Sequence, residues 1–158
     1  MNYHEDLVAD FARRTRENLE TLRKVKEIHR DWSVFEVTQL INSMLGLLVF
    51  PQQRYIDEIP TVSMHELIAR GWPVPRLTGA YPQAQDLKTL VRYMRNAISH
   101  FNIDFLERQN GEITGLRIWN TDPRQAGRKT WEAELSVTEL EAITLQFINL
   151  LVGEGAFR

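Results

Sequence analysis

Apolar side chains recur every three or four residues through most of the chain, which is the spacing of amphipathic helices. Five stretches have this spacing: 3–30, 33–50, 63–70, 83–101 and 136–152. Three of them begin with a serine that is followed three residues later by a glutamate, at Ser33, Ser63 and Ser136. Such a pair forms a capping box, in which each side chain accepts a hydrogen bond from a free amide of the first turn. The pattern predicts five helices, and we expect the second, which is apolar on most sides, at the centre of the core.

A different pattern follows Asn110-Gly111, where apolar residues alternate loosely on either side of the polar loop NTDPRQAGRK. Alternation of this kind is typical of β-strands and predicts a hairpin over residues 112–135. The proline-containing segment 72–82 is expected to lack regular structure. The expected fold is a single domain over 1–158 that is mainly all-α, a helical bundle of about five helices with a β-hairpin inserted before the last helix.

Composition excludes several classes of protein and of site. The chain has 158 residues, 43% of them hydrophobic and 25% charged, which is typical of a globular domain. It has no cysteine, so disulfides, thiolate catalysis and cysteine-ligated zinc are excluded. No clustered carboxylates or paired histidines suggest a metal site, and no metal or cofactor is expected. The N-terminus lacks the apolar core of a signal peptide, and the longest apolar run, VTQLINSMLGLLVF, is too short for a membrane span. We expect a cytoplasmic protein without membrane contacts.

The segment RNAISHFN, residues 95–102, carries the candidate chemistry near the end of the fourth predicted helix. At about 100° per residue, the apolar residues of this helix fall on one side, within an arc of roughly 100°. Four polar residues lie outside that arc: Arg95, Asn96, Ser99 and His100. They therefore face water or another surface. Spacing alone is weak evidence for a site, because Arg23 and His29 form a similar pair in the first predicted helix.

The motif resembles the signature of the HEPN superfamily (higher eukaryotes and prokaryotes nucleotide-binding), an arginine and a polar residue followed, after three positions, by a histidine. Arg95, Asn96 and His100 match these three positions. The stretches FEVTQLINSMLGLLVFP and RNAISHFNIDF are similar to a bacterial HEPN group, so the resemblance covers most of the chain. It implies a metal-independent endoribonuclease that acts as a toxin or defence effector, with an antitoxin protein as a further partner. HEPN toxins paired with a nucleotidyltransferase antitoxin carry a tyrosine two positions after the histidine. This chain has Asn102 there, so regulation through that tyrosine is not expected.

Cleavage of RNA without a metal needs one group that moves protons and another that matches the charge building on the phosphate. Imidazole exchanges protons near neutral pH, which makes His100 the candidate for the first role. Arg95 offers a fork of permanently charged donors for the phosphate oxygens, and Asn96 would orient the imidazole or donate to the substrate. Weaker candidates for substrate contacts are Arg92, Ser99 and Asn102. Attack by the 2′-hydroxyl predicts products with a 2′,3′-cyclic phosphate and a 5′-hydroxyl.

One copy of the motif spans roughly 140° from Arg95 to His100, which is too wide for a single phosphate. The resemblance implies a solution, because HEPN proteins typically dimerise so that two motifs face each other across one cleft. A C2 homodimer that binds RNA is therefore expected. Two alternatives stay open. One is a non-catalytic HEPN module that binds RNA, a nucleotide or a protein partner, and the other is a plain helical dimerisation domain.

The net charge of −2 means that any contact with RNA must be local, because proteins that bind nucleic acid non-specifically carry a basic excess. Two copies of the motif would concentrate positive charge, and three residues of the predicted hairpin loop would add to it: Arg124, Arg128 and Lys129. Trp119 and Trp131 are interpreted as core residues of the hairpin in preference to stacking platforms for bases.

Overall fold

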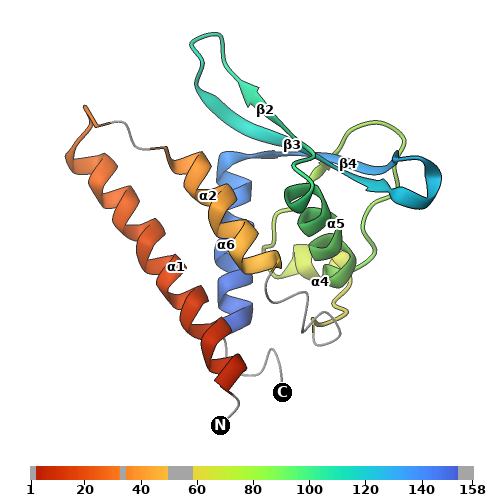
Figure 1. The fold of residues 1–158 in the computed structure, drawn as a ribbon, viewed down its shortest axis with the longest axis horizontal. Coiled ribbons are helices and arrows are strands. Elements are labelled where there is room, and N and C mark those ends of the chain that lie inside the picture. Colours follow the sequence, from red (N-terminus) through yellow and green to blue (C-terminus); the bar gives the residue numbers. More distant parts are fainter. Residues whose placement is uncertain (1–2, 33–34, 50–58, 153–158) are drawn as a thin grey trace.

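Five α-helices and a four-stranded antiparallel sheet form the part of the chain that the structure describes, which is residues 3–32, 35–49 and 59–152 (Figure 1). The structure is a computed structural model. The helices are α1 (Tyr3–Ile28), α2 (Glu36–Met44), the π-helical turn η1 (Leu45–Val49), α4 (Met64–Ala69), α5 (Leu87–Ser99), the 3-10 turn η2 (Pro123–Gln125) and α6 (Val137–Val152). The strands are β1 (Arg76–Leu77), β2 (Ile103–Glu107), β3 (Ile113–Asp122) and β4 (Arg128–Ser136). No helix within these ranges is both long and apolar enough to cross a membrane.

The sheet has the strand order β1-β4-β3-β2, and all neighbouring strands are antiparallel. β3 and β4 are the predicted hairpin, with β1 and β2 as additional strands at the two edges. The expectation of a mainly all-α bundle with one hairpin is therefore wrong. The described residues form a mixed α/β fold, in which the sheet is a full layer beside the helices.

Neither edge strand is expected from the sequence, and the reasons differ. β1 has only two residues and lies in the proline-containing segment, so its pairing with β4 is set by tertiary contact. β2 follows directly on α5, in a region that helical periodicity extends into. The helix ends at Ser99 because Phe101 adopts the left-handed conformation, with φ 53°. Gly111, with φ 79°, then turns the chain from β2 into β3.

One of the three predicted capping boxes is confirmed in full, at Ser136, and at Ser63 the serine half of the box is confirmed. Ser63 Oγ accepts a hydrogen bond from Glu66 N at 3.2 Å at the start of α4. Ser136 and Glu139 bond reciprocally at the start of α6, at 2.7 Å from Ser136 N to Glu139 Oε2 and 3.2 Å from Glu139 N to Ser136 Oγ. The chain therefore passes from β4 into α6 without a loop.

The third predicted box, at Ser33, lies outside the described residues. Helix α2 begins at Glu36, with Phe35 as its N-cap residue and without a side-chain cap. The Glu36 carboxylate instead accepts a hydrogen bond from Lys26 Nζ at 2.6 Å, so it links the end of α1 to the start of α2. Glu36 therefore belongs to the junction between α1 and α2.

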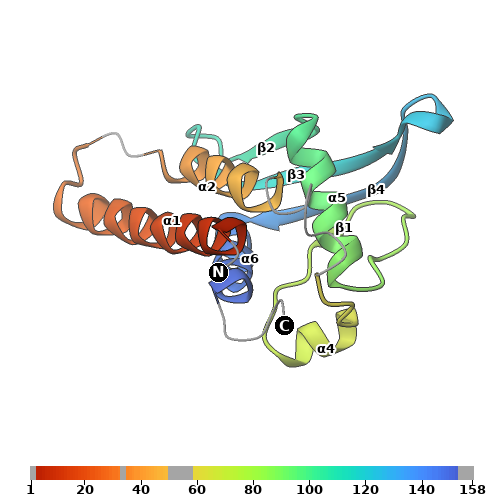
Figure 2. The same ribbon diagram turned by 60° about the horizontal axis from the view of Figure 1, so that its bottom comes forward.

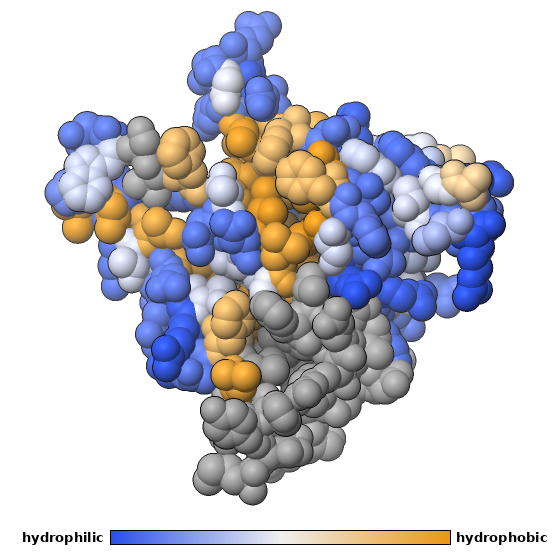
Figure 3. Space-filling view, in the orientation of Figure 1, coloured by the Kyte–Doolittle hydropathy of each residue, from blue (hydrophilic) through white to orange (hydrophobic). Residues whose placement is uncertain are grey.

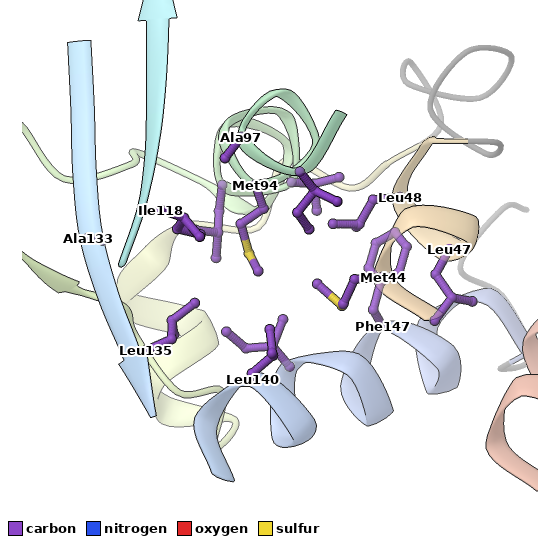
Figure 4. Close-up of a cluster of buried hydrophobic side chains, with 14 of the residues drawn as sticks. Met44, Leu47, Leu48, Met94, Ala97, Ile118, Ala133, Leu135, Leu140 and Phe147 are labelled. Atoms are coloured by element: carbon purple, nitrogen blue, oxygen red, sulfur yellow. The ribbon is translucent and has the colours of Figure 1, made fainter. Parts of the chain in front are cut away.

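The hydrophobic core lies between the inner face of the sheet and the helices α2, α5 and α6 (Figure 4). α5 contributes Met94 and Ala97, which point toward Ile118 of β3 and toward the apolar residues of α6. α1 covers α6 and α2 from outside, away from α5 (Figure 2). Helix α5 is therefore held between β3 of the sheet and the α2–η1 segment.

Candidate functional site

The motif lies at the C-terminal end of α5, beside the base of the β2–β3 hairpin (Figure 1). The helix begins at Leu87 rather than at residue 83, because Asp86 is its N-cap. The Asp86 carboxylate accepts a hydrogen bond from Thr89 N at 2.7 Å. The motif residues therefore lie in the last turns of a well-capped helix that is packed on β3.

The end of α5 is a Schellman motif around His100, which is the C-cap residue. Phe101 N donates to Ile98 O at 3.1 Å, and Asn102 N donates to Ala97 O at 2.8 Å. Phe101 occupies the left-handed position where glycine is usual, at a cost of about 1–2 kcal/mol. The ending presents His100 at the exposed tip of the helix.

The six candidate residues lie off the core side of α5 or just beyond it. Arg92, Ser99 and His100 are exposed, and Arg95, Asn96 and Asn102 are half-buried. The neighbouring residues Met94, Ala97 and Ile98 are buried. The polar residues of the motif therefore lie away from the core, as helical periodicity indicates. The chemical roles of the six residues stay predictions.

A chain of hydrogen bonds holds Arg95 and ties it to the sheet. Arg95 Nη1 donates to Asn96 Oδ1 at 2.9 Å, and Asn96 Nδ2 donates to Asn120 Oδ1 at 3.0 Å. Asn120 Nδ2 in turn donates to Thr130 Oγ1 at 2.7 Å. Helix α5 and both strands of the β3–β4 hairpin therefore contribute to the position of one guanidinium.

The Nε of Arg95 is buried and has no hydrogen-bond partner within the described parts of the chain. An unsatisfied buried donor costs about 1–3 kcal/mol. The Ser43 hydroxyl and the Trp131 indole nitrogen are buried without a partner in the same way, so this feature is not specific to the motif.

Asn120 and Thr130 are not identified as site residues by sequence reasoning, because Asn120 is the first residue of the polar loop of the predicted hairpin and Thr130 follows its last residue. The available signal is the alternation of β3. Leu116, Ile118 and Asn120 share the inward face of the strand, and all three are buried. A polar residue that continues an inward apolar row needs partners, and this one has them.

The basic loop residues lie at the tip of the β3–β4 hairpin, which extends beyond α5 (Figure 1). Arg124 and Arg128 are exposed. Lys129 forms an ion pair with Glu132 and lies over the Trp119 ring, with 4.4 Å from Nζ to the ring centroid. The structure therefore separates the tip from the motif rather than combining them into one cluster.

The two tryptophans of the hairpin have different surroundings. Trp131 is fully buried, so the interpretation as a core residue is confirmed for it. Trp119 is half-buried, and its ring is covered by Lys129 instead of by the core. Its backbone N donates to Asn102 O at 3.2 Å, which links β3 to the segment just after the motif.

The similar pair on α1 has a structural explanation for each member. Arg23 forms an ion pair with Glu141 of α6. The His29 ring stacks on Trp32, with 4.2 Å between ring centroids. These contacts fasten α1 and its end, so Arg23 and His29 serve as internal controls for the motif on α5.

An apolar surface extends below the β2–β3 hairpin, between α2 and α5 (Figure 3). Large apolar side chains beside the motif are exposed: Phe101 is 69% exposed and Phe105 of β2 is 40% exposed. β2 is also an edge strand of the sheet. Exposed aromatic rings beside an unpaired strand edge are typical of a surface that binds a protein.

The described residues contain no group of three or more histidine, aspartate or glutamate side chains that could hold a metal ion. The arrangement at the end of α5 can instead supply a cation, an amide and an imidazole to an anionic ligand.

Comparison with protein-family models matched residues 1–154 to a family described as HEPN pEK499 p136. The match spans the motif and the complete β3–β4 hairpin. No curated protein and no solved structure matched the chain.

Proposed function

Because the chain belongs to the HEPN family described as pEK499 p136, we propose that it is a metal-independent endoribonuclease that acts as a toxin or defence effector. The observation that supports this activity best is the arrangement at the end of α5. The guanidinium of Arg95 is held through Asn96, and His100 is exposed one helical turn beyond Asn96. Two facing copies of this arrangement would suit a phosphate ester with a neighbouring hydroxyl.

In the proposed reaction, His100 accepts the proton of the 2′-hydroxyl, and the 2′-oxygen attacks the phosphorus. The bond from phosphorus to the 5′-oxygen breaks, and that oxygen gains a proton from a protonated imidazole. Arg95 balances the negative charge on the phosphate oxygens in the transition state, while the bond to the 2′-oxygen forms and the bond to the 5′-oxygen breaks. The products are a 2′,3′-cyclic phosphate and a 5′-hydroxyl.

A C2 homodimer completes the proposed site. Arg95 and His100 lie too far apart around the helix for one phosphate, at roughly 140°, whereas two facing copies can supply one group each. The exposed rings of Phe101 and Phe105 belong to the segment that ends and follows the motif, where dimerisation would bring two copies of α5 together. Burial of these rings would supply the driving force for association.

Replacement of Phe101 by glycine is expected to stabilise the subunit and weaken the dimer. Glycine relieves the left-handed backbone, so the free energy of unfolding should rise by about 1 kcal/mol. Loss of the exposed ring should raise the dimer dissociation constant by about tenfold or more. Denaturant unfolding and sedimentation equilibrium measure the two quantities.

Ile68→Ser is the matched control, since Ile68 on α4 is also exposed, at 55%, and lies outside the apolar surface beside the motif. It should leave association unchanged. A Phe101→Gly protein that dimerises as tightly as the wild type would place the dimer interface elsewhere.

The hairpin tip is expected to bind phosphates that flank the cleaved bond. In a His100→Ala background, which prevents cleavage, Arg124→Gln with Arg128→Gln should lower the slope of log Kobs against log salt by about 1.4 for single-stranded RNA. Arg13→Gln with Arg14→Gln is the charge-matched control, because both arginines are exposed and pair with Asp10 on α1. Equal slopes for all the proteins would show that the tip does not contact RNA.

The proposed activity is tested by incubating the protein in EDTA with RNA and with DNA of the same sequence. Cleavage of the RNA alone is expected, because DNA lacks the attacking 2′-hydroxyl. Cleavage of both nucleic acids, or of neither, would contradict the proposed function.

A further inference from the structure

We propose that Asn120 of β3 is a positioning residue for Arg95, so that the β3–β4 hairpin is part of the ribonuclease site and not an appendage of the helical domain. The proposal rests on the proposed function. It assigns a role to a residue outside the motif, through the hydrogen bonds that connect β3 to α5.

The surroundings of Asn120 argue against a role in stability alone. Its side chain is 7% exposed and follows Leu116 and Ile118, which are 2% and 1% exposed, on the inward face of β3. Burial of an amide costs about 1–3 kcal/mol unless hydrogen bonds compensate for it. An aliphatic side chain would fill this position without that cost. The amide is therefore explained by the groups that it binds.

The order of donors and acceptors in this chain allows one arrangement. A guanidinium has donors only, so Asn96 must present its Oδ1 to Arg95. Asn96 Nδ2 then faces Asn120 and needs an acceptor, which is Asn120 Oδ1. Asn120 Nδ2 is left to donate to Thr130 Oγ1. Asn120 therefore fixes the Asn96 amide in the orientation that Arg95 requires.

A β-bulge brings the last member of the chain into reach. Asn120 is paired with Trp131 and Thr121 with Lys129, so Thr130 is an extra residue of β4. Its hydroxyl accepts from Asn120 Nδ2 and donates to Asn120 O at 3.4 Å. Bulges re-aim side chains near functional sites, and this one secures Asn120 from the far strand.

Loss of the Asn120 amide should act on catalysis through Asn96. Without an acceptor on β3, Asn96 can rotate away from Arg95, and the guanidinium loses its lateral hydrogen bond. Misplacement of a charged group by about 1 Å typically lowers a rate by about 100-fold. Asn120→Leu keeps the branched shape of the side chain and removes both hydrogen bonds, so it should lower kcat by about 10- to 100-fold while the protein stays folded.

A double-mutant cycle tests whether Asn120 affects kcat through Asn96. Asn120→Leu is measured in the wild-type protein and in the Asn96→Ala protein, by cleavage of RNA in EDTA. The further loss in the Asn96→Ala background should be about twofold or less, because the group through which Asn120 acts is already absent. An equal loss in both backgrounds would show that Asn120 only supports the fold, and would overturn the proposal.

Two variants of Thr130 test whether its hydroxyl contributes to the activity. Thr130→Ser keeps the hydroxyl and should stay within about twofold of wild type, whereas Thr130→Val should lose activity by several-fold. Thr144→Val is the matched control. Thr144 is fully buried in α6 and donates to Leu140 O at 2.7 Å, so its loss removes a buried hydroxyl away from the motif. Activity of Thr144→Val as low as that of Asn120→Leu would overturn the proposal.

An NMR measurement tests the same contact without reference to activity. The side-chain amide protons of Asn96 should exchange slowly with solvent in the wild type and rapidly in Asn120→Leu. Rapid exchange in both proteins would overturn the proposal. A wild type that cleaves no RNA but protects these protons would contradict the proposed function alone, and the positioning of Arg95 by Asn120 would stand.

Discussion

His100→Ala is expected to lower the rate of RNA cleavage in EDTA by about 100- to 10,000-fold, the usual contribution of a positioned general acid or base. The protein should stay folded, because the imidazole is exposed and the backbone N–H of residue 100, which donates to Asn96 O at 3.1 Å, is kept by alanine. The rate is measured with a labelled oligoribonucleotide under single-turnover conditions. Expression of the wild type, but not of His100→Ala, should slow bacterial growth.

His29→Ala is the control for this variant. His29 also lies at the end of a helix, but it stacks on Trp32, far from α5 along the fold. Its removal should leave the cleavage rate within about twofold of wild type. A folded His100→Ala protein that cleaves RNA as fast as the wild type would remove His100 from the mechanism.

Arg95→Ala should lower kcat by about 100- to 1,000-fold, the cost of losing one donor aimed at developing negative charge. Arg95→Lys should not restore activity, because an ammonium cannot bind Asn96 and a phosphate with the same planar fork. Stability should change little, since the variant removes the unsatisfied buried Nε together with the bond to Asn96. Single-turnover kinetics and thermal unfolding report the two effects.

Arg23→Ala is the matched control, because Arg23 forms an ion pair with Glu141 on the surface of α1. It should retain the wild-type rate. Full activity of Arg95→Ala, with the same RNA products, would mean that another cation serves the phosphate.

Sequence periodicity correctly places the motif on a helix, because the apolar stripe of α5 is strong enough to show which side faces the core. The serine cap at Ser63 and the capping box at Ser136 likewise depend only on local chemistry. β1 depends on a distant partner, since Leu77 pairs with Ala133 of β4. β2 pairs with β3 across a short loop that contains Asn110-Gly111, which is a local hairpin signal, but it follows directly on α5, where helical periodicity continues. The fold class was wrong because these two strands were not expected.

In the site, likewise, residues that are close in the sequence are predictable, whereas a contact between distant residues is not. Arg95, Asn96 and His100 stand within six positions of the sequence, so a short motif reveals them. The contact of Asn96 with Asn120 joins residues 24 positions apart. It requires the register of β3 and the packing of α5 on that strand. Asn120 could be suspected from the inward row of β3, but its partner could not.

The proposed homodimer would connect these features. A single subunit presents a fixed cation and an exposed imidazole on different sides of one helix end, and the rings of Phe101 and Phe105 that follow are exposed. Two subunits joined at these rings would place two sets of groups around one phosphate. The net charge of −2 is compatible with this arrangement, because the positive charge is needed only within the cleft and at the hairpin tip.

The most direct test of the ribonuclease assignment is the chemistry of the product ends formed by the wild-type protein in EDTA. The account predicts a 2′,3′-cyclic phosphate on one fragment and a 5′-hydroxyl on the other, with no cleavage where the 2′-hydroxyl is replaced by hydrogen. Products that carry a 3′-hydroxyl and a 5′-phosphate, or binding of RNA without any cleavage, would contradict it.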